Sequence, residues 1–192
     1  MKNHRLIACG LIGLLFAGSA SAHTFGAQGA GFAQGLAHPF LGLDHLLAMF
    51  AVGLWASQLG GPALWRVPLA FVAVMAGGAL WANWGLDAAL AETVIALSVL
   101  ALGVIIACAV RLPMAWSLPL VALFALGHGY AHGLEMPEAA SPWGYGAGFL
   151  LATAGLHLAG IAAGLSARRH RALVRLGGLA IAASGAWLLA GI

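Results

Sequence analysis

Two short stretches of this chain concentrate histidine and carboxylate side chains: HPFLGLDH over residues 38–45 and GHGYAHGLE over residues 127–135. Nitrogen and oxygen ligands without a thiolate favour a borderline divalent ion such as nickel, cobalt or zinc over copper(I), and magnesium prefers oxygen ligands and water. The two stretches therefore indicate a site for a divalent transition-metal ion. Its candidate ligands are His38, Asp44, His45, His128, His132 and Glu135.

The elements that must position these residues are membrane-spanning. Hydrophobic residues make up 62% of the 192 residues and charged residues only 7%, far from the roughly 25% of an ordinary soluble domain. Each apolar segment has about the 20 residues that cross a bilayer, and lipid offers no partner to an unpaired backbone, so all should be helices. The fold class is therefore all-α, with six transmembrane helices over 39–58, 64–84, 90–110, 114–133, 143–165 and 172–191.

Residues 1–22 have the features of a cleaved secretory signal. A basic start precedes a short apolar run, and the small residues Ala-Ser-Ala at 20–22 form a cleavage site. His23 then becomes the mature N-terminus, and residues 23–192 form the six-helix domain. The alternative is a lipoprotein signal cut before Cys9, which has only a short apolar run ahead of it.

The charges set an orientation for the six helices. Every basic residue beyond position 22 lies at or beside the links 59–63, 111–113 and 166–171, whereas four acids lie at the opposite links. The positive-inside rule therefore places both mature termini in the periplasm of a bacterial inner membrane. The bilayer is the expected partner and nucleic acid is not, because the mature chain has nearly as many acids as arginines. The arginines are Arg66, Arg111, Arg168, Arg169, Arg171 and Arg175, and the four acids are Asp87, Glu92, Glu135 and Glu138.

This orientation brings both motifs to one depth. If Pro39 opens the first helix, Asp44 lies about 8 Å below the outer surface, and His128 and His132 lie one turn apart near the outer end of the fourth helix. An ionisable residue in hydrocarbon costs about 2.5–3.5 kcal/mol, so Asp44 needs a partner or a water-filled cavity. We expect one metal-binding pocket. The alternative is that Asp44 pairs with one histidine and the others are satisfied interface residues.

Two further histidines are candidates. His23 would offer its α-amine and its imidazole to one ion from a Gly-rich tether, unless its place at the cut site is an accident. His157 lies about 21 Å below the outer surface, either as a deeper relay ligand or as a core histidine bonded to a neighbouring helix. The single cysteine of the mature chain, Cys108, excludes an intrachain disulfide and a multi-thiolate site.

The two motifs, His38-x5-Asp44-His45 and His128-Gly-x-Ala-His132-Gly-x-Glu135, resemble the signature of the HupE/UreJ family of nickel permeases. The resemblance covers the whole chain. It implies facilitated uptake of nickel across the inner membrane to supply hydrogenase or urease maturation, with the matched residues important for transport. Gly127 stands where the family pattern usually has phenylalanine, which affects packing rather than ligands.

The expected mechanism treats Ni²⁺ as a transported substrate, with no prosthetic group. His23 and His38 capture the ion, the cluster of both motifs receives it, and His157 is the next step inward. No phosphate-binding loop occurs, so the ion gradient and membrane potential drive the flux. The alternatives are a metal-dependent hydrolase, although Gly129 stands where a zincin has its general-base glutamate, and a metal-sensing accessory subunit. Oligomeric state and the choice among nickel, cobalt and zinc stay open.

Overall fold

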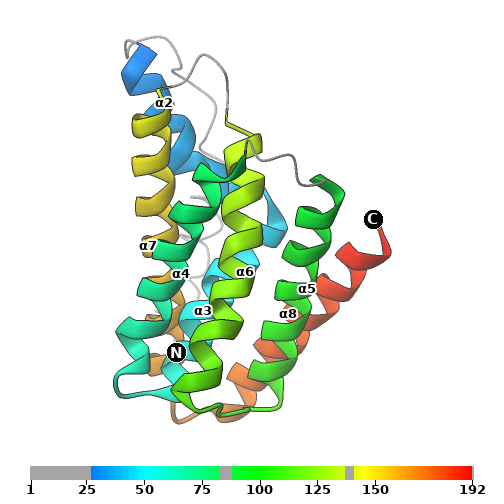
Figure 1. Ribbon diagram of the computed structural model, residues 1–192. Coiled ribbons are helices and arrows are strands. Elements are labelled where there is room, and N and C mark those ends of the chain that lie inside the picture. Colours follow the sequence, from blue (N-terminus) through cyan, green and yellow to red (C-terminus); the bar gives the residue numbers. More distant parts are fainter. Residues whose placement is uncertain (1–26, 83–87, 137–140, 192) are drawn as a thin grey trace, which may run out of the picture.

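The computed structural model describes residues 27–82, 88–136 and 141–191, and these residues contain helices and no strand (Figure 1). The predicted signal peptide and His23 lie outside the described residues. The elements are α2 (Ala27–Ala37), the 3-10 turn η1 (His38–Phe40), α3 (Leu43–Leu59), α4 (Ala63–Leu80), α5 (Ala88–Ala107), α6 (Met114–Leu134), α7 (Pro142–Ser166) and α8 (Arg171–Ala190).

Five of these helices, α4 to α8, are long and apolar enough to cross a membrane, which confirms the corresponding predicted segments. Their ends follow local sequence signals. In α7 the Ser141 hydroxyl accepts a hydrogen bond from the Gly144 backbone N–H at 3.3 Å, and Pro142 occupies the first turn, where its missing N–H leaves no bond unmade.

The prediction of one continuous helix over 39–58 was wrong. Pro39 lies in η1, and α3 begins only at Leu43, after Gly42 adopts an extended conformation. The segments 31–40 and 43–59 meet at 78°, so they form a broken span or a re-entrant turn. The Gly-rich stretch expected to be a tether is helical from Ala27 and packs on α7.

The helix α3 lies at the centre of the bundle and packs against α7, α5 and α4. Around it, α4 packs on α6 and α5 packs on α8 (Figure 1). Two glycines allow the closest approaches near the candidate site. A side chain at Gly53 would collide with the His157 carbonyl group, and one at Gly129 would collide with the Met75 carbonyl group. Close packing through small residues is the usual means of helix association in membranes.

The two ends of the bundle differ. The links after α3, α5 and α7 all lie at the lower end in Figure 1, and the arginines lie in these links or in the first two turns of the helices that follow them. The helix α2 and the start of α3 lie at the upper end, toward which α8 returns. The alternation of the six predicted segments thus places the arginine-rich links together, as the charge pattern predicts.

Candidate metal-binding site

The upper end of the bundle brings the two sequence motifs together. The 3-10 turn η1 carries His38, the first turn of α3 carries Asp44 and His45, and the last turns of α6 carry His128 and His132. The break before α3 decides this arrangement, because it lets His38 and His45 approach α6 from two directions.

Three buried imidazoles form the inner donor group: His45, His128 and His132. One nitrogen from each lies within 4.8 Å of the others, and the rings of His45 and His132 are 4.2 Å apart between centroids. Metal–nitrogen bonds of about 2.1 Å allow a spacing of at most about 4.2 Å, so ring movements of less than about 1 Å bring these nitrogens to coordination distance. The inner group can therefore supply three imidazole ligands to one ion.

A second, more exposed group lies beside the first and shares a member with it. His38, His132 and Glu135 again offer ligand atoms within 4.8 Å of one another. The Nε2 atom of His38 lies 2.9 Å from Glu135 Oε2, and the Nδ1 atom of His132 lies 3.6 Å from the same oxygen. His132 therefore belongs to both groups, and an ion held by the outer group is already next to the inner one.

Asp44 lies behind the inner group and belongs to neither donor group. Its Oδ1 atom accepts hydrogen bonds of 2.7 Å from both the backbone N–H and the Nδ1 atom of His45. A carboxylate only accepts, so His45 carries its proton on Nδ1 and its buried Nε2 keeps a free lone pair. The structure thus gives Asp44 the position of a residue that orients a ligand, which is a common arrangement around metal-binding histidines.

Ser98 of α5 has the corresponding position beside His128, and the sequence analysis did not single it out. Its hydroxyl donates to the Ile95 carbonyl oxygen at 2.7 Å and lies 3.0 Å from His128 Nε2. Since the hydroxyl proton is used, Nε2 of His128 donates to Ser98 and the buried Nδ1 keeps its lone pair. A hydroxyl in the otherwise apolar run IALSVLAL was the signal that could have revealed it.

His157 lies farther along α7 and outside both donor groups. It is 1% exposed, and neither ring nitrogen has a hydrogen-bond partner. The ring of Phe71 separates it from the inner group, with its centroid 5.6 Å from that of His128 and 5.2 Å from that of His157. His157 is therefore a core histidine without the hydrogen bond to a neighbouring helix that the alternative requires.

Most buried polar atoms without a partner belong to these histidines or lie close to them. In the described part of the chain, all such side-chain atoms but one belong to the inner histidines, to His157 or to the hydroxyl of Tyr145, whose ring lies 5.7 Å from that of His38. Buried polar groups in native proteins usually have partners, so a row of free imidazole nitrogens indicates a ligand. The lone pairs of these nitrogens could replace water molecules bound to a metal cation.

The model of the HupE/UreJ protein family matches residues 11–188 of this sequence. The chain belongs to the HupE/UreJ family. Protein HupE of Rhizobium leguminosarum bv. viciae is 47% identical to this HupE/UreJ chain over 176 residues, which cover 90% of this chain and 91% of the relative. No solved structure gives a significant match. The range matched to the HupE/UreJ family includes both donor groups and His157.

Proposed function

We propose that this protein is a permease that carries Ni²⁺, or Co²⁺, into the cytoplasm by facilitated diffusion through its histidine path. Membership of the HupE/UreJ family supports a nickel or cobalt permease-type accessory role, in which the metal supplies hydrogenase or urease maturation. The observation that carries the finer proposal is the pair of donor groups that share His132. A shared ligand allows transfer without a step in which the ion has lost all protein ligands.

The outer group suits capture. His38 and Glu135 are accessible, and a carboxylate with an imidazole can replace part of the hydration shell of an arriving dication. His23, which lies outside the described residues, remains a proposed additional capture ligand at the mature N-terminus left by a cleaved signal peptide.

The inner group suits passage. His45 and His128 each present one lone pair because Asp44 and Ser98 hold the protons of their other nitrogens. Three neutral ligands bind a dication less tightly than a closed four-ligand site, and a permeation site must release what it binds. His157 is the proposed next ligand, reached when the Phe71 ring moves aside.

Uptake of radioactive nickel into vesicles that contain only this protein tests the proposal. We expect accumulation in vesicles with the unchanged chain and near-complete loss with His132→Ala, because this change removes a ligand from both groups. His170→Ala is the matched control, since His170 is exposed in the α7–α8 link. Absence of uptake by the unchanged chain would favour the hydrolase or sensor alternatives, and competition by cobalt and zinc would rank the ions.

A further inference from the structure

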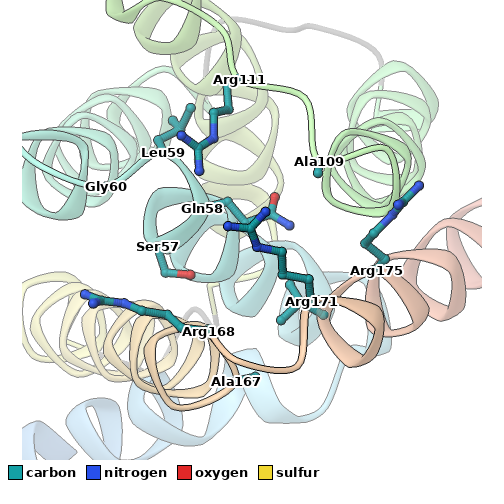
Figure 2. Close-up of a pocket in the computed structure, with 12 residues that line it drawn as sticks. Ser57, Gln58, Leu59, Gly60, Ala109, Arg111, Ala167, Arg168, Arg171 and Arg175 are labelled. Atoms are coloured by element: carbon teal, nitrogen blue, oxygen red, sulfur yellow. The ribbon is translucent and has the colours of Figure 1, made fainter.

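A second polar site lies at the opposite end of the bundle from the histidines. A cavity of about 750 Å³ opens between the end of α3, the α5–α6 link, the end of α7 and the first turn of α8 (Figure 2). Four of its lining residues are arginines: Arg111, Arg168, Arg171 and Arg175. Two separate segments of the chain, the α5–α6 link and residues 168–175, therefore bring positive charges to one cavity.

No carboxylate in the described part of the chain neutralises these charges. None of the carboxylates within residues 27–82, 88–136 and 141–191 lines the cavity, and every ion pair found in these ranges joins a histidine to Asp44 or Glu135. Within the same ranges the side chains of Arg111, Arg168 and Arg171 make no hydrogen bond. Like charges gathered around one cavity repel one another, so an anion bound among them would be stabilised.

The fourth arginine helps to form the wall of the cavity. The Nε atom of Arg175 donates to the Ala107 carbonyl oxygen at 2.7 Å, and Figure 2 shows its side chain turned away toward α5. The amide nitrogen of Gln58 likewise donates to the Ile106 carbonyl oxygen at 3.1 Å. These bonds fix the wall between α3, α5 and α8, while Arg111 and Arg171 extend into the space in front of it (Figure 2).

The chemistry of this cavity suits a phosphate group. The planar guanidinium group donates in pairs to phosphate oxygens, and the first turn of α8, a 20-residue helix, adds backbone N–H groups at its N-terminus. Apolar residues continue from the cavity, since Leu59 and Val174 line it and the side chain of Leu173 is 61% exposed beside it on α8. A ligand with both phosphate and acyl chains would satisfy both surfaces.

We propose that this cavity binds the phosphate groups of an anionic phospholipid of the cytoplasmic leaflet. Its place at the ends of transmembrane helices is the level of lipid headgroups, and exposed Trp65 and Trp116 lie near the same ends of α4 and α6. Basic pockets between helices on this side of a membrane are suited to such headgroups. The proposal does not depend on which metal the histidines bind.

Binding of fluorescent cardiolipin to the purified full chain in detergent micelles tests it. Arg168→Gln with Arg171→Gln should weaken cardiolipin binding about thirtyfold, because each arginine near anionic lipid contributes about fivefold to the affinity. The matched control, Arg66→Gln with Arg169→Gln, removes the same charge outside the cavity and should change binding less than about twofold. Arg168→Lys with Arg171→Lys should fall between them, because lysine lacks the paired donors.

Any one of three results would overturn the proposal. The cavity variant and its control could lose cardiolipin affinity equally, or the unchanged chain could bind phosphatidylcholine as tightly as cardiolipin. In the third, inorganic phosphate would displace cardiolipin at the same concentration as unlabelled cardiolipin does. The last would assign the cavity to a free anion. Circular dichroism and nickel binding establish that each variant is folded. If the variant with glutamine at positions 168 and 171 is not folded, the variant with lysine at both positions is compared instead with its own control, Arg66→Lys with Arg169→Lys.

Discussion

Two of the three inner histidines, His45 and His128, depend on a neighbour that sets which of their nitrogens is free. Asp44 holds the Nδ1 proton of His45, and Ser98 accepts the Nε2 proton of His128. The two residues therefore keep different ring nitrogens free, although both belong to the inner donor group. A ligand so oriented loses little freedom on binding metal, and its neighbour also adjusts its basicity.

Asp44→Asn should lower nickel affinity about 10- to 100-fold, the usual effect of changing such a neighbour of a ligand. The amide oxygen can still accept a hydrogen bond, but the charge that strengthens His45 as a ligand is gone. Equilibrium nickel binding to the purified protein and uptake into vesicles measure the change. Amounts of protein in the membrane should stay the same, and unchanged uptake would refute the role given to Asp44.

Ser98→Ala should reduce nickel affinity about tenfold, because His128 Nε2–H loses its acceptor in a fully buried position. Ser98→Thr, which keeps the hydroxyl, should retain most of the binding. Ser184→Ala is the control: its hydroxyl donates to the Ala180 carbonyl oxygen at 3.1 Å within α8, away from the site. Equal effects at positions 98 and 184 would mean that the Ser98 hydroxyl serves only helix packing.

At the scale of elements, the short helix α2 places the outer ligand His38. Glycines make this docking possible, because α2 and α7 approach so closely that a side chain at Gly148 would collide with the Phe32 carbonyl group. The chain then turns through η1, where Pro39 is buried, and enters α3 after the bend of 78°. The position of His38 thus depends on contacts about 110 residues away in sequence, at α7.

Gly148→Leu should therefore weaken capture without removing any ligand. Displacing α2 from α7 moves His38 away from Glu135, and we expect the half-saturating nickel concentration for uptake to rise about tenfold, or about 1.4 kcal/mol. Gly146→Leu is the matched control, since a side chain there meets open space on the same helix. The idea fails if both leucine variants take up nickel with the same concentration dependence as the unchanged chain.

At the scale of the whole molecule, the charges are distributed unequally between the two ends. Histidines and carboxylates gather at one end, and the arginine-lined cavity lies at the other. If lipid phosphate occupies the cavity, as proposed above, it neutralises part of the positive charge that a dication would otherwise meet at that end of the bundle. In the proposed permease, the electrical potential supplies the driving force for inward flux.

Facilitated diffusion sets a limit to accumulation. An inside-negative potential of 100 mV is worth about 4.6 kcal/mol for a dication, equivalent to about 2,000-fold accumulation at equilibrium. In vesicles clamped with potassium and valinomycin, the inside-to-outside ratio of free nickel should approach this value, and it should fall to about one when the potential is set to zero. Net accumulation at zero potential without a proton gradient would contradict passive transport and indicate another energy source.

The membrane class, the helical content, the approximate bounds of five spans and the family could all be predicted from the sequence. These follow from the length of apolar runs, from the need to pair the backbone in lipid and from the two motifs, all of which are local properties of the chain. It also indicated the histidines and carboxylates of the candidate site, because ionisable residues are rare in apolar segments.

How those residues are arranged relative to one another could be read only from the tertiary structure. Contacts between distant helices decide four features of the site. These are the bend before α3, the place of Asp44 outside the donor groups, the hydrogen bond between Ser98 and His128, and the Phe71 ring between His128 and His157. The gathering of the arginines around one cavity depends on the same packing. Hydropathy and spacing along one segment record how far it extends, but not which face of a neighbouring helix it meets.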